Sequence, residues 1–203
     1  FRHGTDHAVA FANGTVALAA MYLAAGIGPG DEVIVPSFTF IATATSVVHV
    51  GATPVFADID PITFNIDPAA VARCITPRTK AIVPVHYGGQ PADMDRLLEL
   101  ATAHGLSVFE DAAQAHGASY RGRPAGSLGR AAMFSFTPVK AITTGEGAVV
   151  TTDDADLAHR MRLLRNHGMD RPYHHEIVGY NWRLSEMQSA LGVKQLDRLD
   201  EIL

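Results

Sequence analysis

The chain has 203 residues, of which 47% are hydrophobic and 18% charged, and its formal net charge is −5 at pH 7. This length and composition allow one sizeable hydrophobic core, and the negative charge argues against an extended nucleic-acid-binding surface. The only cysteine, Cys74, excludes an intrachain disulfide framework and indicates a reducing, cytoplasmic compartment.

The uncharged stretch 8–30 is long enough for a membrane span, which needs about 20 apolar residues. However, Asn13-Gly14-Thr15 breaks it early and Gly28-Pro29-Gly30 ends it, so we predict a buried amphipathic helix and no membrane association. The chain begins at Phe1 and stops within a predicted helix, so we expect it to be an excerpt of a longer protein.

Helices and strands alternate along the chain. The apolar periodicity and the turn residues predict, in order, a helix over 14–25, strand 31–35, helix 40–50, strand 53–57, helix 67–73, strand 80–85, helix 94–104, strand 106–110, strand 149–152, helix 154–165 and helix 188–203. The His- and Gly-rich segment 165–176 is expected to be an exposed loop. Short apolar strands between helices predict a three-layer α/β/α fold with a largely parallel sheet.

Ligands in such sheets bind beyond the carboxyl ends of the strands. Asp111 follows the strand 106–110, and Lys140 closes the aromatic segment Phe134-Ser135-Phe136-Thr137-Pro138-Val139-Lys140. A lysine that forms a Schiff base and an acid that keeps the pyridine nitrogen protonated are what pyridoxal phosphate chemistry requires. Taken alone, Asp111 could cap a turn and Lys140 could be an ordinary surface lysine.

Other residues suit the same cofactor. Gly14 and Thr15 open the first helix, whose free N–H groups and dipole form a phosphate site, although a plain helix start would look the same. The Ser135 hydroxyl could hold the same phosphate. Phe40 could stack on the pyridine ring or belong to the core. Gln114 could reach the phenolic oxygen of the cofactor or be a solvated loop residue.

Two weaker patterns are set aside. Gly26-Ile27-Gly28-Pro29-Gly30 follows a helix instead of a strand and contains a proline, which favours a reverse turn over a dinucleotide loop. His167, His174 and His175 lack the spacing of metal ligands, so no metal site is expected.

Five segments together resemble the DegT/StrS family of nucleotide-sugar aminotransferases, namely 13–18, 28–40, 110–117, 134–140 and 179–186. The resemblance runs from Gly4 to Leu203. It implies the large domain of the aspartate aminotransferase-like fold of PLP-dependent transferases, with a mixed, mostly parallel sheet. Residues 1–203 would then be this PLP-binding domain, truncated at the N-terminus and lacking most of the C-terminal small domain. It also implies a homodimer with active sites at the interface.

The resemblance also implies a role for each site residue. Lys140 would be the Schiff-base lysine and Asp111 the pyridinium partner. The remaining contacts would be Gln114 on the phenolic oxygen, Phe40 on the ring, Gly14, Thr15 and Ser135 on the phosphate, and Asn181 on the phosphate from the neighbouring subunit. The segment 142–147 is similar to members that aminate C-4 of a keto sugar, whereas Ala141 and Ala148 depart from the common pattern.

The predicted function is PLP-dependent transamination of a nucleotide-linked keto sugar, at C-4, with glutamate or a similar amino donor, in amino-sugar biosynthesis. One alternative is a sugar dehydratase of the same family, whose members carry histidine where Lys140 stands. Another is a non-catalytic module that senses a cofactor or a sugar nucleotide. A nicotinamide-dependent oxidoreductase would need a glycine loop after the first strand, which this sequence lacks.

Overall fold

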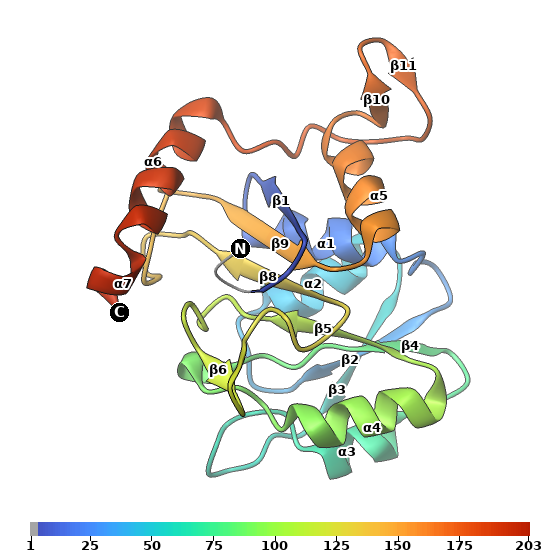
Figure 1. The fold of residues 1–203 in the computed structure, drawn as a ribbon. Coiled ribbons are helices and arrows are strands. Elements are labelled where there is room, and N and C mark those ends of the chain that lie inside the picture. Colours follow the sequence, from blue (N-terminus) through green and yellow to red (C-terminus); the bar gives the residue numbers. More distant parts are fainter. Residues whose placement is uncertain (1–3) are drawn as a thin grey trace.

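A computed structural model describes residues 4–203, and a seven-stranded sheet forms its centre (Figure 1). In spatial order the strands are β1 (His7–Phe11), β9 (Ala148–Thr152), β8 (Ala131–Ser135), β5 (Ser107–Asp111), β4 (Thr79–Ile82), β2 (Glu32–Pro36) and β3 (Thr53–Ala57). Strand β9 pairs antiparallel with β1 and β8, and the other neighbours pair parallel. The mixed, mostly parallel sheet is therefore confirmed.

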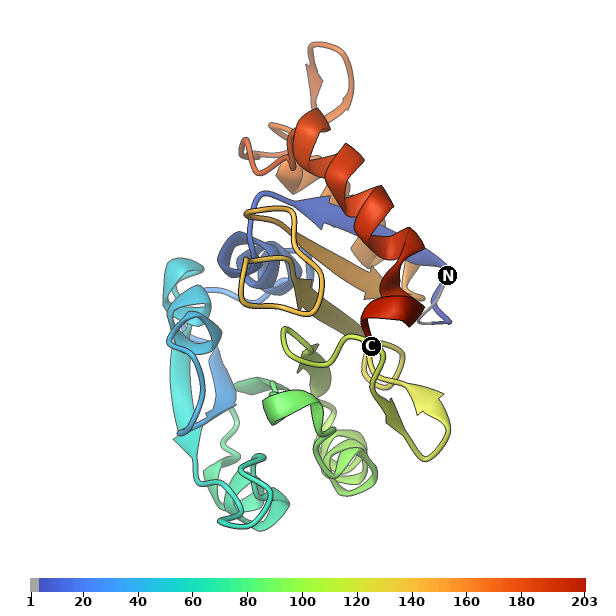
Figure 2. The ribbon, with the colours of Figure 1, turned by 90° about the vertical axis from the view of Figure 1, so that its left-hand side faces the viewer.

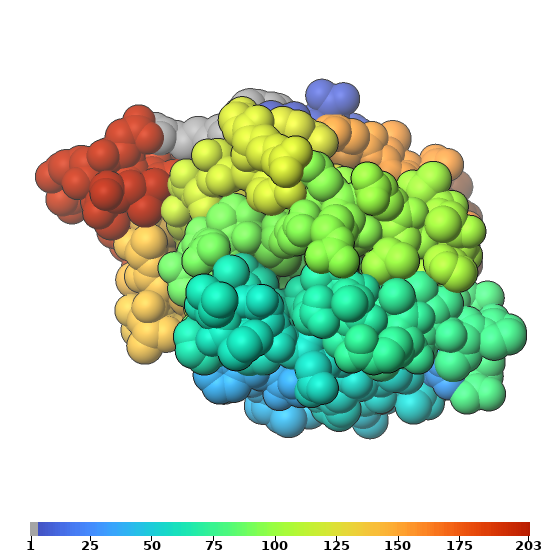
Figure 3. Space-filling view, turned by 90° about the horizontal axis from the view of Figure 1, so that it is seen from below, coloured from blue at the N-terminus to red at the C-terminus, as the bar shows by residue number. Residues whose placement is uncertain are grey.

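Helices cover both faces of the sheet, which gives the three layers that Figures 1 and 2 show from two sides. Helices α1 (Gly14–Ala24), α2 (Ala42–His49) and α5 (Ala155–Arg165) share one buried cluster with the sheet. Helices α3 (Pro68–Cys74) and α4 (Met94–His104) share another, and they cover the face seen in Figure 3. Because strand side chains alternate, Val33 and Val35 belong to the first cluster and Ile34 to the second.

Side-chain caps begin four of the helices. Asn13, Asp67, Asp93 and Asp154 each accept a hydrogen bond from a backbone N–H in the first turn of α1, α3, α4 and α5. These caps satisfy donors that have no partner within the helix. Gly105 ends α4 with φ of 66°, a left-handed conformation that glycine adopts without steric cost.

The remaining elements lie around this core. They are the 3₁₀ turn Tyr87–Gly89, the hairpin of β6 (Ser119–Tyr120) and β7 (Arg123–Pro124), the hairpin of β10 (Met169–Arg171) and β11 (His174–His175), and helices α6 (Glu186–Asp197) and α7 (Leu199–Ile202). The hairpin β10–β11 projects from the body, and α6 lies along one edge of the molecule (Figures 1 and 2). Among residues 4–203, no helix combines the length and the apolar character that crossing a bilayer requires.

Three sequence expectations are corrected. Strands β1 and β8 were not predicted, because alanine-rich segments such as Ala131–Ser135 become strands only through pairing with neighbours on both sides. Of the segment 165–176, residues 170–176 are exposed as expected, whereas Gly168 is buried, and the segment contains the hairpin β10–β11 instead of an open loop. The helix expected over 188–203 begins at Glu186, after a capping box at Ser185, and is interrupted at Arg198.

Candidate active site

A cavity of about 580 Å³ lies at the carboxyl ends of the parallel strands. Its walls come from the start of α1, from the start of α2 and the segment before it, and from the ends of β5 and β8 with the turns that follow them. Seven of the eight predicted site residues line it: Gly14, Thr15, Phe40, Asp111, Gln114, Ser135 and Lys140. Segments more than 120 residues apart in the sequence therefore meet at one place.

Asp111 is the last residue of β5 and is only 5% exposed. Its Oδ2 accepts a hydrogen bond from the Thr43 hydroxyl at 2.7 Å, and its Oδ1 accepts one from the Ala113 N–H at 3.2 Å. Burial raises the pKa of the Asp111 carboxyl above its usual range, although both hydrogen bonds and the charge of Lys140 oppose this shift. Both hydrogen-bond donors are neutral, so this buried carboxylate would be stabilised by a cationic partner in the cavity.

Lys140 lies in the turn that follows β8, where its backbone N–H donates to the Thr137 carbonyl at 3.0 Å. The side chain is partly buried and lines the same cavity as Asp111. Within the described part of the chain, the Lys140 amine forms no ion pair and no hydrogen bond. The amine is therefore available to react with or bind a molecule in the cavity.

A phosphate-sized corner is formed by the first turn of α1 and the end of β8. Asn13 caps α1 by accepting from the Val16 N–H at 3.1 Å, which leaves the N–H groups of Gly14 and Thr15 free to bind an anion. A Cβ on Gly14 would lie 3.3 Å from the Met133 sulfur and 3.7 Å from the Ser135 Cβ. The missing side chain thus lets α1 approach β8 closely and brings the Ser135 hydroxyl to the same corner.

Phe40 and Gln114 stand at the mouth of the cavity. Phe40 is 74% exposed although it lines the site, so its ring is accessible to a planar molecule. The Gln114 Oε1 accepts the Gly88 N–H at 2.7 Å. Because the amide oxygen is used in this way, the Gln114 NH₂ group remains as a donor toward the cavity.

Helix α6 fixes the loop that follows Lys140. The Gln188 amide donates to the Glu146 carbonyl at 2.9 Å, and the Gln195 side chain accepts the Thr143 N–H at 3.2 Å. Glu146 itself lines the cavity. The segment 186–197 therefore contributes to the site by positioning this loop, which the sequence alone did not indicate.

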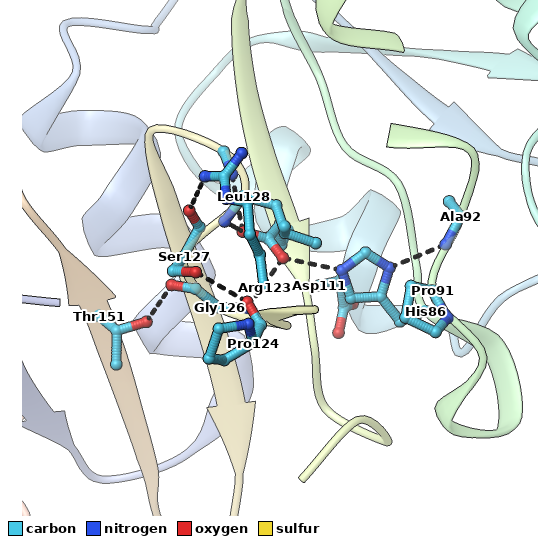
Figure 4. A network of polar contacts seen from close by, with 12 residues as sticks. His86, Pro91, Ala92, Asp111, Arg123, Pro124, Gly126, Ser127, Leu128 and Thr151 are labelled. Carbon is cyan, nitrogen blue, oxygen red and sulfur yellow. Dashed lines mark hydrogen bonds and ion pairs between the residues drawn. The ribbon is translucent and has the colours of Figure 1, made fainter. Parts of the chain in front are cut away.

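Glu110, next to Asp111, faces the other side of the sheet. It accepts hydrogen bonds from the His86 imidazole at 2.8 Å and from the backbone N–H groups of Gly126, Leu128 and Gly129 at 2.8–2.9 Å. Figure 4 shows this network, in which His86, Gly126 and Leu128 are labelled. The His86 Nδ1 accepts the Ala92 N–H, so the Nε2–H donates to Glu110. Burial opposes the ionisation of Glu110, but these hydrogen bonds outweigh it and lower the pKa of the carboxyl.

Sequence reasoning missed Thr43, the hydrogen-bond partner of Asp111. The residue is 1% exposed, and its hydroxyl also lies 2.8 Å from the hydroxyl of Thr39. In the helix expected over 40–50, Thr43 would share a face with Phe40, three residues earlier, but the structure begins α2 at Ala42 and leaves Phe40 before it. That spacing was the available signal, but it did not reveal which strand the hydroxyl would meet.

Asn181 is the one predicted site residue that does not line the cavity. It is exposed and pairs with Asn166 in an isolated antiparallel bridge, beyond the hairpin β10–β11. Its predicted contact belongs to a neighbouring subunit, so its distance from the cavity of its own chain does not test that role.

The residues in the cavity fit pyridoxal phosphate. The buried Asp111 carboxylate suits a protonated ring nitrogen, the Lys140 amine suits an aldehyde, and the corner between α1 and Ser135 suits a phosphate. The Gln114 NH₂ group is a donor for a ring oxygen. These groups come from three separate parts of the chain, the start of α1, segment 111–114 and segment 135–140, and line one cavity.

Comparisons with known proteins indicate the family of the chain. The sequence profile of the DegT/DnrJ/EryC1/StrS aminotransferase family matches residues 2–203. GDP-perosamine synthase of Caulobacter vibrioides is 58% identical over 202 residues, which cover 98% of this chain and 54% of that protein. The UDP-N-acetyl-3-dehydro-alpha-D-glucosamine 3-aminotransferase of Acidithiobacillus ferrooxidans is 52% identical over 189 residues, which cover 93% and 51%.

A solved structure has the same fold. DesV of Streptomyces venezuelae, in complex with a ketimine intermediate, superposes with a TM-score of 0.95 at 50% identity, covering 98% of this chain and 54% of that one. The chain thus spans about half the length of the relatives it matches. From the profile match and these identities we conclude that the chain belongs to the DegT/DnrJ/EryC1/StrS aminotransferase family.

Proposed function

We propose that the protein is a PLP-dependent aminotransferase that transfers an amino group from glutamate, or a similar donor, to the C-4 keto group of a nucleotide-linked sugar. One observation carries this proposal: Lys140 and Asp111, 29 positions apart in the sequence, line one cavity together with the phosphate-binding corner of α1. Residues 1–203 would form the cofactor-binding large domain of a longer chain, which acts in the cytoplasm.

Each residue has a distinct task in this reaction. Pyridoxal phosphate, when bound, supplies a ring that accepts the electron pair released at the substrate carbon. The Lys140 Nζ would hold the cofactor. After release it would take the proton from the donor's α-carbon as a general base and deliver it, as a general acid, to the carbon that carried the cofactor's aldehyde. The Asp111 carboxylate keeps the ring nitrogen protonated, and the Gln114 NH₂ group orients the ring through its oxygen.

Two relatives support the substrate class but not the sugar position. One is named a GDP-perosamine synthase and the other a 3-aminotransferase, at 58% and 52% identity. Our preference for C-4 comes from the segment 142–147. Incubating the full-length protein with 4-keto and 3-keto nucleotide sugars, followed by NMR of the products, tests it. Amination of only the 3-keto substrate would reject C-4 and keep the aminotransferase assignment.

The cofactor assignment has a direct spectroscopic test. The full-length protein loaded with pyridoxal phosphate should absorb visible light as a Lys140 adduct, and glutamate should convert the band to that of the pyridoxamine form. Lys140→Ala should abolish the adduct band. If the band survives in Lys140→Ala, the role of Lys140 is wrong. If the band forms and no amino donor converts it, the sensor alternative replaces the enzyme.

We also propose that two copies share their active sites. Phe40 and Ile41 are 74% and 63% exposed at the start of α2, and Val48 on the same helix is 56% exposed. Phe56 on β3, against which α2 packs, is 54% exposed. A second copy covering this apolar surface would close the open side of the cavity.

Subunit complementation tests the shared site. Asn181→Ala and Lys140→Ala should each be inactive, but a mixed dimer has one complete site if Asn181 acts on the neighbouring subunit. Random mixing should then restore about a quarter of the wild-type activity, because half of the dimers are mixed and each has one of two sites intact. If mixtures that light scattering shows to be dimeric recover no activity, Asn181 acts in the site of its own subunit or in neither site.

A further inference from the structure

A chain of hydroxyl groups leads from the wall of the cavity to Asp111. The Thr43 hydroxyl donates to the Asp111 Oδ2 at 2.7 Å, and the Thr39 and Thr43 hydroxyl oxygens are 2.8 Å apart. Thr43 is 1% exposed, and all three residues border the cavity. None of the tasks in the proposed reaction uses either threonine.

The direction of these hydrogen bonds follows from the number of hydrogens. An ionised carboxylate only accepts, so the single Thr43 hydroxyl hydrogen is directed at Asp111. The Thr43 oxygen then accepts from Thr39. Such a series polarises each hydroxyl and strengthens the last hydrogen bond in a buried, low-dielectric place.

The two oxygens of Asp111 are held from different elements. Thr43 of α2 holds Oδ2, and the Ala113 N–H, two residues after the strand, holds Oδ1. The plane of the carboxylate is therefore fixed on both sides. Without the Thr43 hydroxyl, Oδ2 would be a buried acceptor with no donor, and the charged form of Asp111 would lose stabilisation.

We propose that Thr43, supported by Thr39, is a positioning residue that keeps the Asp111 carboxylate ionised and oriented toward the cofactor's ring nitrogen. The inference rests on the proposed function for the identity of the cofactor. Its effect on Asp111 itself does not require the cofactor to be present.

Other charged and titratable groups face Asp111, and they set the background for Thr43. Lys140 from the turn after β8 favours the charged carboxylate, and His86 after β4 is a second titratable neighbour. Tyr22 of α1 lies close enough that the two groups disfavour each other's ionisation. Burial raises the pKa of Asp111, and the Thr43 hydrogen bond is the largest effect opposing this. Removing the Thr43 hydroxyl should therefore change the pKa of Asp111 measurably.

The first test measures the pKa of Asp111 in the cofactor-free full-length protein by ¹³C NMR of its carboxyl group. Thr43→Val keeps the shape and removes the hydroxyl, and it should raise this pKa by about one unit. Thr43→Ser should restore the wild-type value, and Thr39→Val should have a smaller effect of the same sign. Thr45→Val is the matched control, because Thr45 is on the same helix but does not line the cavity. An unchanged pKa in Thr43→Val would overturn the proposal.

The second test is a double-mutant cycle on the dissociation constant of pyridoxal phosphate, measured by absorbance titration. Thr43→Val should weaken binding about tenfold, and far less in the Asp111→Asn background, because the effect passes through the carboxylate. Equal weakening in both backgrounds would show a packing effect and reject the proposal. If the wild type does not bind the cofactor, the proposed function fails, and the NMR comparison still decides the effect of Thr43 on Asp111.

Discussion

Two neighbouring carboxylates on one strand, Glu110 and Asp111, occupy opposite environments. Glu110 faces the α4 side of the sheet and is fully satisfied by His86 and three backbone N–H groups, so its pKa is lowered. Asp111 faces the cavity, has only a hydroxyl and one N–H as donors, and its pKa is raised. Both carboxyl groups are buried, so the number of hydrogen-bond donors decides whether the pKa of each is lowered or raised. The satisfied carboxylate stabilises the fold, whereas the other remains available for a ligand.

Removing the satisfied carboxylate should have the largest effect on stability. Glu110→Ala leaves the His86 Nε2–H and three backbone N–H groups buried without an acceptor, so we expect a loss of about 3–5 kcal/mol in the free energy of unfolding. Urea denaturation of the cofactor-free protein measures it. Glu99→Ala, at an exposed position in α4, is the control and should change little. A loss below about 1 kcal/mol for Glu110→Ala would mean that water replaces these bonds.

Neutralising the other carboxylate should mainly affect function. Asp111→Asn removes the charge that holds the ring nitrogen protonated, so the rate constant of the half-reaction with glutamate should fall about a hundredfold or more, equivalent to about 2.7 kcal/mol. Single-turnover kinetics with glutamate measures the effect, with Asp156→Asn, an exposed position in α5, as the control. Activity close to wild type would remove Asp111 from the mechanism.

The pH dependence of stability should differ between the two carboxylates. Because the folded pKa of Asp111 lies above its unfolded value of 3.8, the wild type loses stability relative to Asp111→Asn as pH rises from that value to the folded pKa. Between these two pKa values, the difference in the free energy of unfolding between wild type and Asp111→Asn changes by at most about 1.4 kcal/mol per pH unit. The contribution of Glu110 has the opposite sign, since it is present above 4.5 and lost as pH falls through its lowered pKa.

Denaturation curves of wild type and Asp111→Asn at several pH values measure this difference. At neutral pH, saturating pyridoxal phosphate should cancel the greater stability of the Asn variant, because in the wild type the ring nitrogen then pairs with the Asp111 carboxylate. A difference that does not vary with pH would show that Asp111 has the same pKa in the folded and unfolded states.

The smallest predicted effect concerns the mouth of the cavity. Gln114→Ala loses the hydrogen bond to the Gly88 N–H and the NH₂ donor, so the dissociation constant of pyridoxal phosphate should rise about fivefold. The free energy of unfolding of the cofactor-free protein should change by less than about 1 kcal/mol. Gln90→Ala, an exposed glutamine outside the cavity, is the control. An unchanged dissociation constant would exclude Gln114 from cofactor binding.

The contrast also shows what the sequence can predict. Asp111 and Lys140 were found because each follows a short apolar segment in a recognisable local pattern, and the structure brings both to one cavity. Glu110 stands in the same pattern, but nothing local indicates that Gly126, Leu128 and Gly129 supply its donors. Those contacts depend on how the segment after β7 folds back onto β5.

Thr43 and β8 were missed for the same reason. A threonine in a helix does not by itself reveal that the carboxylate at the end of β5 lies within 2.7 Å. The residues of β8 favour a helix as much as a strand, and only the pairing with β5 and β9 decides. The helices with side-chain caps were predicted well, because a cap is set by residues close in sequence.

The most direct test of the account is to locate the cofactor's attachment point. The full-length protein, loaded with pyridoxal phosphate and reduced with borohydride, should yield a proteolytic peptide that carries the phosphopyridoxyl group on Lys140, identified by mass spectrometry. The other lysines of residues 1–203, Lys80 and Lys194, are exposed and do not line the cavity, and they serve as internal controls. Modification of either in place of Lys140, or no modification at all, would contradict the account.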